Sequence, residues 1–456
     1  MTNKLEAMEF YERGKGDIVT PLKYVCGAAG TGKTFNVKQA IANDSKYGLL
    51  CATTGIAAIN LGAITINSLL KYFDTASLSE AFMNGWVQQR LLKLAKDGYK
   101  WLVVDEVSMM AAEQLDIIYQ STKQVNESLA EMGKPPIGLY LTGDFAQLPP
   151  IRAKWAFEAE CWSLFDAATE KLTKVWRQSD AKFLDAINHI RAGRGMVGAT
   201  LLAQLGVEFT KVTDQRFNGT TIIAKNDAVD NFNWLCLSKV PGVPYIIKSD
   251  RWMMNGRRMP KDWDNIPGEL KLKDNALVMI LANDTSPTGE FSYCNGDCGH
   301  IVKFDSVRQV ATIRLIRNLE EVEIGRIQRK ETQKEPPDEI LMANPDVSED
   351  DLREKYGDYQ AGQPRWDSSH GREGAWVTGC VTFMPLRLAY ASTVHKTQGL
   401  TLDRIQVDLN QNFMSAPSMC YVALSRCKSP QGLRIVGSPA LLGSRVKIDP
   451  SVSKWL

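Results

Sequence analysis

The stretch Leu22-Lys-Tyr-Val-Cys-Gly-Ala-Ala-Gly-Thr-Gly-Lys-Thr34 joins a short apolar strand directly to the pattern Gly-x-x-x-x-Gly-Lys-Thr. Its glycines let the backbone turn N–H groups toward phosphates, and the helix expected next points its positive end at the same anion. The pattern predicts a P-loop, with Lys33 on the β- and γ-phosphates of a nucleotide and Thr34 on Mg²⁺. The predicted nucleotide-binding residues of this loop are Gly27, Ala28, Ala29, Gly30, Thr31, Gly32, Lys33 and Thr34.

Two further apolar strands end in the polar groups that hydrolysis needs. Trp101-Leu-Val-Val-Asp-Glu106 predicts that Asp105 holds Mg²⁺ and that Glu106 orients and polarises the attacking water. Ile137 to Pro150 contains Gly-Asp-x-x-Gln, which places Gln147 at the same sheet edge, where it can sense the γ-phosphate. Read alone, Gln147 would be an ordinary loop amide. Together the three patterns predict hydrolysis of a nucleotide with Mg²⁺.

The composition sets outer limits on domains and compartment. The chain has 456 residues, 44% of them hydrophobic, which favours several domains. Lys and Arg number 54 against 52 Asp and Glu, and this balance neither favours nor excludes nucleic acid, because a binding groove needs local charge. Nine scattered cysteines and a first segment without an apolar run indicate a reduced, cytoplasmic setting, or a host cytoplasm if the chain is viral.

The segment from Gly48 to Leu70 carries no charge over a length that could span a bilayer. Polar residues interrupt it, and its opening is typical of a buried parallel strand followed by a loop and a helix. We therefore expect α/β core and no membrane partner. A sharper interpretation is that Thr53, Thr65 and Asn67, at strand and loop ends, face a bound nucleic acid strand.

The order of the motifs resembles that of superfamily 1 helicases of the RecD, Dda and PIF type. Gly-Ala-Ala-Gly-Thr-Gly-Lys-Thr, Asp-Glu-Val-Ser-Met and Gly-Asp-Phe-Ala-Gln-Leu-Pro-Pro carry the first part of the resemblance. Lys174-Val-Trp-Arg-Gln-Ser-Asp180 resembles the fourth motif of the family, Ala391-Ser-Thr-Val-His-Lys-Thr-Gln-Gly-Leu-Thr401 the fifth, and Tyr421-Val-Ala-Leu-Ser-Arg426 the sixth. The motifs follow the family order over most of the chain.

The resemblance implies roles for residues outside the P-loop. Arg177 and Arg426 are the expected arginine fingers, supplied by a second domain so that closure depends on the γ-phosphate. For either arginine alone, a surface or salt-bridged role would be the default. Gln398 belongs to the implied nucleotide-binding set, and His395 and Lys396 to the implied DNA track.

The implied fold is α/β, with two RecA-like domains and inserted accessory domains. We expect the first RecA-like domain at residues 1–165, with a wedge-like insertion at 72–98, and the second split between 166–250 and 376–456. Short β runs between them predict a small barrel at 251–375, and the family resemblance implies that this barrel is similar to Src-homology-3 domains. The acidic stretch from Glu331 to Arg372 predicts a mobile or divergent, solvated insertion. In the wedge, Phe73, Phe82 or Trp86 could stack on a parting base pair, or could simply be core.

Two departures from the family pattern affect ligand recognition. The segment Leu5 to Arg13 lacks the glutamine stretch that reads adenine in the family, so base selectivity is open, although Phe10 or Tyr11 could stack on the base. Where the family carries Thr-x-His-Ser, this chain has Thr65-Ile-Asn-Ser68. The change keeps an amide at Asn67 and removes an imidazole.

The resulting prediction is an ATP-dependent DNA helicase that moves 5′→3′ on single-stranded DNA and unwinds duplex junctions in replication, recombination or repair. We expect a monomer that works with single-strand-binding or replication proteins. One alternative is a translocase that strips proteins from single strands without processive unwinding. Another is a recombination mediator whose DNA binding is regulated by nucleotide. RNA as the track is a weaker alternative, because no pattern identifies 2′-hydroxyl contacts.

Overall fold

The computed structural model describes residues 19–223, 226–254, 256–260, 263–264, 266–282, 292–293, 295–357, 365–368 and 374–456. The chain forms two compact units. The first contains the residues up to Ser179 together with Ile448–Leu456, and the second contains Asp180–Lys447. The chain therefore passes between the units twice, after Ser179 and after Lys447.

The first unit is built on a six-stranded sheet with the order β3-β2-β4-β5-β1-β6, in which every neighbouring pair is parallel. Its strands are β1 (Leu22–Gly27), β2 (Gly48–Ala52), β3 (Ile64–Thr65), β4 (Trp101–Asp105), β5 (Gly138–Gly143) and β6 (Thr169–Leu172). The carboxyl ends of β1, β4 and β5 lie together at one edge, because parallel neighbours end on the same side of the sheet. This edge carries the predicted nucleotide site.

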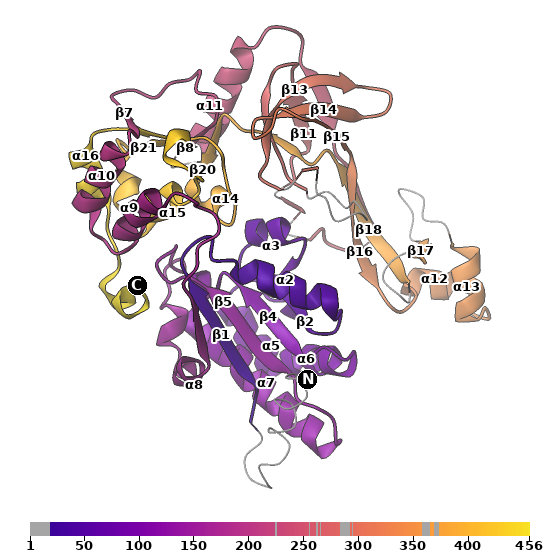
Figure 1. The fold of residues 1–456 in the computed structure, drawn as a ribbon. Helices are drawn as coiled ribbons and strands as arrows, with labels where there is room; N and C mark the ends of the chain where they lie inside the picture. Colours follow the sequence, from indigo (N-terminus) through magenta and orange to yellow (C-terminus); the bar gives the residue numbers. More distant parts are fainter. Residues whose placement is uncertain are drawn as a thin grey trace. The chain divides into compact units, whose positions relative to one another are not determined.

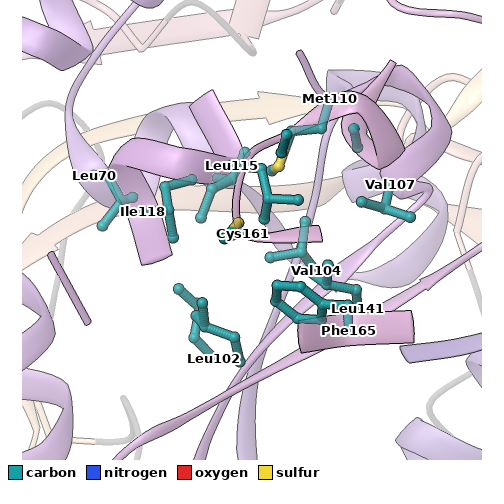
Figure 2. Close-up of a cluster of buried hydrophobic side chains, with 14 of the residues drawn as sticks. Leu70, Leu102, Val104, Val107, Met110, Leu115, Ile118, Leu141, Cys161 and Phe165 are labelled. Atoms are coloured by element: carbon teal, nitrogen blue, oxygen red, sulfur yellow. The ribbon is translucent and has the colours of Figure 1, made fainter. Parts of the chain in front are cut away.

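Helices cover both faces of this sheet (Figure 1). Val37 of α2 packs against Val25 and Val103 on one face, whereas alternate strand residues such as Leu102 and Val104 face the larger cluster on the other. Figure 2 shows part of that larger cluster, where Leu115 and Ile118 of α7 meet the strands. The helical elements of the unit are α2 (Lys33–Asn43), α3 (Gly55–Leu61), α4 (Ile66–Leu70), α5 (Thr75–Met83), α6 (Trp86–Lys96), η1 (Val107–Met109), α7 (Ala112–Glu131), η2 (Ala156–Glu158), α8 (Trp162–Ala167) and η6 (Pro450–Trp455).

The predicted boundary of the first domain at residue 165 is too early. Strand β6 pairs with β1, with Leu172 opposite Gly27, so the chain stays in the first unit through Ser179. The segment Ile448–Leu456, assigned to the second domain from the sequence, also belongs to the first unit. Its Val452 is fully buried in the large cluster, and this burial is the physical reason for the correction.

The predicted insertion at 72–98 is helical and packs on the first unit. Helices α5 and α6 contact each other and α7, and Leu78 and Leu91 are fully buried. Among the three candidate wedge aromatics, Phe82 is partly buried against the core, whereas Phe73 and Trp86 are exposed. Within the described residues, no helix combines the length and the apolar character needed to cross a membrane.

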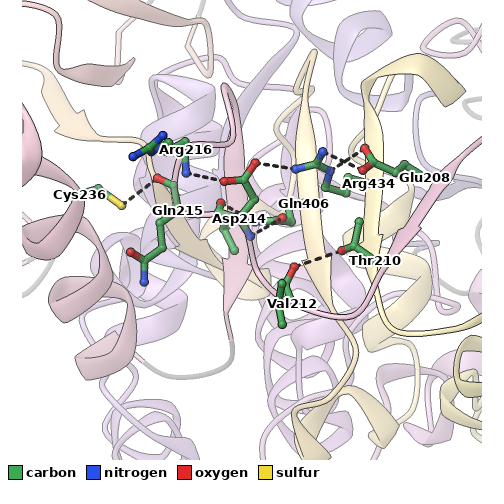
Figure 3. Close-up of polar contacts among 10 residues, drawn as sticks. Glu208, Thr210, Val212, Asp214, Gln215, Arg216, Cys236, Gln406 and Arg434 are labelled. Atoms are coloured by element: carbon green, nitrogen blue, oxygen red, sulfur yellow. Dashed lines mark hydrogen bonds and ion pairs between the residues drawn. The ribbon is translucent and has the colours of Figure 1, made fainter.

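The second unit contains a five-stranded parallel sheet with the order β20-β8-β21-β22-β7. Figure 3 shows polar contacts on one side of this sheet. Arg434 donates from Nε and Nη2 to the Glu208 carboxylate at 2.7 and 2.8 Å, and from Nη1 to Asp214 at 2.8 Å. Its strands and the helices around them are β7 (Glu208–Thr210), β8 (Thr220–Ile223), β20 (Ala391–Thr393), β21 (Ile405–Asp408), β22 (Leu433–Val436), α9 (Ala181–Arg191), α10 (Gly195–Gln204), α11 (Asn226–Lys239), α14 (Val394–Thr397), η4 (Asn412–Ser415), α15 (Met419–Leu424), η5 (Pro430–Gly432) and α16 (Pro439–Arg445). The two parallel sheets confirm the predicted α/β class.

An antiparallel accessory part lies within the second unit. A five-stranded sheet, β15-β14-β13-β12-β19, shares one core with the ribbon β9-β11 through Ile247, Leu272 and Ile313. The strands are β9 (Tyr245–Lys248), β11 (Glu269–Leu272), β12 (Leu277–Ile280), β13 (Cys298–Asp305), β14 (Val310–Leu315), β15 (Glu321–Gly325) and β19 (Leu386–Leu388). This part therefore begins before residue 251 and ends after residue 375, outside the predicted bounds.

The acidic stretch has more structure than the sequence indicates. Strand β18 (Ala375–Phe383) pairs with β10 (Asp250–Met253), β16 (Ile327–Gln333) and β17 (Arg365–Asp367). Helices α12 (Asp338–Ala343) and α13 (Glu349–Lys355) supply Ile340 and Leu352 to a small core around the fully buried Trp376. The description of 331–372 as solvated surface is therefore wrong for these helices, because widely spaced apolar residues find partners on β17 and β18.

Candidate functional site

The predicted P-loop connects β1 to α2 in the first unit. Gly30 and Gly32 have φ values of +84° and +85°, a backbone region that other residues rarely adopt. Lys33 is 8% exposed, and its Nζ donates to the carbonyl oxygens of Gly27 at 2.8 Å and Ala28 at 3.2 Å. The ammonium is thus held over the loop whose N–H groups are predicted to bind phosphates.

Asp105, at the end of β4, is bound to the start of α2. Thr34 Oγ1 donates to Asp105 Oδ2 at 2.6 Å, while the other carboxylate oxygen accepts from the Thr142 hydroxyl and from the Glu106 N–H. A hydroxyl and a carboxylate in contact are the hard oxygen ligands that Mg²⁺ takes from a protein when phosphates and water complete its shell. The residues present therefore fit the predicted magnesium site.

Glu106 has an uncommon backbone conformation. Its φ of 57° and ψ of 44° are left-handed, which costs a residue with a side chain on the order of 1 kcal/mol. The Thr53 hydroxyl donates to the Glu106 carbonyl at 2.8 Å, and the Thr53 N–H donates to the Asp105 carbonyl at 3.3 Å. These bonds hold the carboxylate-bearing residue at the sheet edge, next to the magnesium ligands.

The pKa of Lys33 reports which charged groups lie near its ammonium group. Burial lowers the pKa of Lys33, whereas the carboxylates of Asp144, Glu106 and Asp105 raise it and the Arg177 guanidinium lowers it further. The three carboxylates and the Arg177 guanidinium therefore all lie within electrostatic reach of Lys33.

The turn after β5 supplies Gln147. The Gln147 N–H donates to the Asp144 carbonyl at 2.8 Å, and the Ala146 N–H donates to Asp144 Oδ1 at 3.1 Å. Gln147 is 3% exposed, and its side-chain oxygen has no hydrogen-bond partner among the described residues. A buried amide oxygen without a partner is unfavourable by about 1–3 kcal/mol, so this atom is suited to a ligand or a water.

Arg177 lies against the P-loop inside the first unit. The Trp176 N–H donates to the Gly30 carbonyl at 2.8 Å, and a Cβ placed on Gly30 would lie 2.5 Å from the Cβ of Arg177. The prediction that a second domain supplies this arginine is wrong, because β6 delivers it beside β1. The close approach also explains why position 30 requires glycine.

Trp176 is a residue of this site that the sequence reasoning missed. The residue is 67% exposed, and its ring lies beside Gly32, where an added Cβ would be 3.6 Å from Cδ1. The Nζ of Lys174 lies 3.6 Å from the ring centroid, a cation–π contact that orients the indole. Its position directly before Arg177, the proposed arginine finger, is the sequence feature that could have identified it. Phe10 and Tyr11, the sequence candidates for base stacking, lie outside the described residues.

The second unit holds the sixth-motif arginine and Gln398. Arg426 is 1% exposed and donates to the Val422 carbonyl at 2.9 Å and to Ser425 Oγ at 3.0 Å. Gln398, which follows α14, is 4% exposed. Arg426 is therefore bonded to residues of its own unit, and the roles of Arg426 and Gln398 in nucleotide binding stay predictions.

The candidate DNA residues of the first unit lie at the carboxyl edge of the sheet. Thr53 follows β2 and is bonded to Glu106, whereas Thr65 caps α4 by accepting from the Ser68 N–H at 3.0 Å. Asn67 is partly exposed on α4. Two of the three thus hold local structure as well, whereas the side chain of Asn67 makes no hydrogen bond to another described residue.

The candidates of the second unit lie on α14. Thr393 caps this helix by accepting from the Lys396 N–H at 3.3 Å, which leaves His395 exposed and Lys396 half-buried. Although the residue as a whole is exposed, desolvation of its ring lowers the pKa of His395 and favours the neutral imidazole. Burial and the Arg387 guanidinium lower the pKa of Lys396, and Asp230 raises it. A phosphate would favour the charged form of this lysine.

Comparisons with known proteins extend the similarity over the whole chain. The profile of the family described as PIF1-like helicase matches residues 17–197. The ATP-dependent DNA helicase Pif1 of Psychrobacter sp. is 28% identical over 478 residues, covering 97% of this chain and 68% of that protein. The ATP-dependent DNA helicase PIF1 of Homo sapiens is 26% identical, covering 94% of this chain and 60% of that protein.

A solved structure gives the corresponding result for the fold. The structure of Bacteroides sp Pif1 in complex with ADP-AlF4 has a TM-score of 0.67 and 25% sequence identity, and the alignment covers 97% of this chain and 94% of that one. The profile, the relatives and this structure agree with the order of the motifs and with the two parallel sheets, and by all three comparisons the chain is similar to PIF1-like helicases.

Proposed function

We propose that this chain is an ATP-dependent DNA helicase that moves along single-stranded DNA and unwinds duplex junctions. The observation that carries the proposal is the 2.6 Å hydrogen bond between Thr34 and Asp105, which joins the P-loop to the strand that ends in the hydrolytic carboxylates. The names of the relatives supply the substrate class, because both are called ATP-dependent DNA helicases.

The geometry supports a defined role for each group. The loop N–H groups and Lys33 bind the β- and γ-phosphates, and Glu106 accepts a proton from the attacking water. Gln147 orients that water or the γ-phosphate with its buried amide, and Arg177 stabilises negative charge that develops on the phosphoryl group. Mg²⁺ bound by Thr34 and Asp105 would neutralise charge on the β- and γ-oxygens.

The contact between Thr53 and Glu106 offers a physical link between DNA and hydrolysis. Thr53 lies at the strand end where DNA is proposed to bind, and its hydroxyl holds the Glu106 carbonyl. A strand that displaces this hydroxyl would shift the carboxylate relative to the attacking water. In the second unit, Arg426 and Gln398 are proposed to reach the nucleotide on closure, and His395 and Lys396 to bind DNA phosphates.

The exposure of the three candidate aromatic residues decides which of them can act in the proposed wedge. Phe73 is 68% exposed and Trp86 is 51% exposed, so both are available to stack on a parting base pair. Phe82 is assigned to the core, because it packs against the cluster beneath α5 and α6.

Strand displacement tests the function and its direction. With Mg²⁺ and ATP, a duplex with a 5′ single-stranded tail should be unwound and one with a 3′ tail should not, because the motif set resembles the branch that moves 5′→3′. Rising salt should reduce both DNA binding and rate, since phosphate contacts release counterions. A blunt duplex is the control.

The outcomes of this test separate the alternatives. Displacement from the 3′ tail alone would contradict the branch assignment and leave the ATPase assignment intact. ATP turnover stimulated by single strands without unwinding would favour the translocase, and binding without sustained turnover would favour the recombination mediator.

Trp176 should determine affinity for the nucleotide base. We expect Trp176→Ala to raise the KM for ATP about tenfold, because an aromatic platform for a base contributes about 1–3 kcal/mol, and to change kcat about twofold at most. Trp176→Phe should stay close to the unchanged protein. The exposed Trp234 in the second unit provides a matched control, Trp234→Ala. An unchanged KM in Trp176→Ala would exclude stacking on this residue.

A further inference from the structure

The segment Ile448–Leu456 leaves the second unit and completes the core of the first. The Trp155 indole N–H donates to Asp449 Oδ2 at 3.0 Å, and Val452 is fully buried. Helix η6 within this segment ends at Trp455, which packs against the large cluster. A stretch that follows the second unit in sequence is therefore a structural part of the unit that holds the P-loop.

Trp455 lies in a group of aromatic rings that all belong to the first unit. The centroid of its ring is 5.1 Å from that of Phe145, 5.6 Å from that of Trp162 and 5.7 Å from that of Tyr24. The rings of Trp162 and Tyr24 meet it edge to face, at 86° and 83°. Separations and angles of this kind are favourable for aromatic pairs and fix the rings with respect to one another.

Phe145 connects this aromatic group to the hydrolytic site. It lies between Asp144 and Gln147 in the turn after β5, and it is 1% exposed. Tyr24 lies on β1, which leads into the P-loop. Trp455 therefore packs against the strand that leads into the P-loop, through Tyr24, and against the turn that carries Gln147, through Phe145. It is distant from both in sequence.

We propose that Trp455 is a positioning residue for ATP hydrolysis, which acts through Phe145 on the turn from Asp144 to Gln147. The inference rests on the ATPase function proposed above. Because the chain is continuous from Lys447 to Ile448, tension on the second unit during DNA movement reaches this turn through the segment 448–456. The segment thus couples the grip on DNA to the orientation of Gln147.

The first experiment changes the ring and measures steady-state ATP hydrolysis. We expect Trp455→Leu to lower kcat about fivefold or more while the KM for ATP changes about twofold at most. The reason is that the P-loop stays intact, whereas the turn from Asp144 to Gln147 is held less firmly. Trp455→Leu should also weaken binding of ADP with aluminium fluoride more than binding of ADP alone. Trp455→Phe, which keeps an aromatic ring on Phe145, should restore most of both.

Phe165→Leu is the matched control, because Phe165 is fully buried in the same cluster and packs on Trp162. If Trp455→Leu only lowers the melting temperature, as Phe165→Leu does, and keeps normal kcat below it, Trp455 is a core residue and the proposal is overturned. If the unchanged protein hydrolyses no ATP, the proposed function fails instead.

The second experiment lengthens the link and leaves every ring in place. Four flexible residues, Gly-Ser-Gly-Ser, are inserted between Lys447 and Ile448. Basal hydrolysis should stay unchanged, whereas its stimulation by single-stranded DNA should fall several-fold, because the longer link no longer transmits tension. Full stimulation in this variant would overturn the coupling. This variant also decides the case if Trp455→Leu fails to fold.

Discussion

Replacing Glu106 by Gln should leave ATP bound and reduce its hydrolysis by about 10²-fold or more, because a neutral amide cannot accept the proton of the attacking water. The amide has the shape of the carboxylate, so the bond from Thr53 to the Glu106 carbonyl and the left-handed backbone are kept. Steady-state hydrolysis and equilibrium binding of a fluorescent ATP analogue measure the two quantities.

Glu113→Gln on the exposed start of α7 is the matched control, since it removes the same charge from the same unit. It should hydrolyse ATP at the unchanged rate. Normal turnover in Glu106→Gln would remove Glu106 from its proposed role, whereas loss of ATP binding would show that its charge is needed to organise the P-loop. Lys33→Ala, in contrast, should lose binding and turnover together.

Arg177→Ala should lower ATP turnover by about 10³-fold, because the guanidinium is proposed to stabilise charge that develops on the γ-phosphate. Binding of single-stranded DNA without nucleotide should be nearly unchanged. Arg177→Lys should not restore turnover, since a lysine lacks the planar pair of donors. The pKa of Lys33 should also rise in Arg177→Ala, because the positive charge of Arg177 lowers this pKa in the unchanged protein.

Arg152→Ala, at an exposed position of the same unit, is the control for loss of an arginine. Arg426→Ala should give a similar loss of turnover. Arg426 is buried with hydrogen bonds to Val422 and Ser425, so its replacement should also lower the melting temperature, and thermal unfolding must accompany the kinetics. If either change reduced only DNA binding, that arginine would belong to the DNA track.

The strands and turns around the proposed hydrolytic site were largely predictable because their signal is local. The P-loop, the strand ending at Asp105 and the Gly-Asp-x-x-Gln turn each join one apolar strand to one polar end, and parallel strands bring such ends together. Apolar spacing and strand length are sufficient to predict these elements.

The errors arose where pairing is nonlocal. No short pattern shows that β6 returns to β1, so the domain boundary and the unit that carries Arg177 were misplaced. The helices α12 and α13 were missed because their buried residues, Ile340 and Leu352, are sparse among acidic ones. Trp176 was overlooked because its place beside Gly32 depends on the path of the chain after β6.

The late return of the segment 448–456 has a consequence for synthesis in the cell. At a translation rate of about 5–20 residues per second, the first unit waits roughly 15–50 s between the emergence of Ser179 and that of the residues that complete its core. During this interval the aromatic surface that Trp455 covers is open to solvent and to other nascent chains. We therefore expect nascent chains that end before residue 448 to recruit chaperones or aggregate, even though every motif of the P-loop site has already been translated.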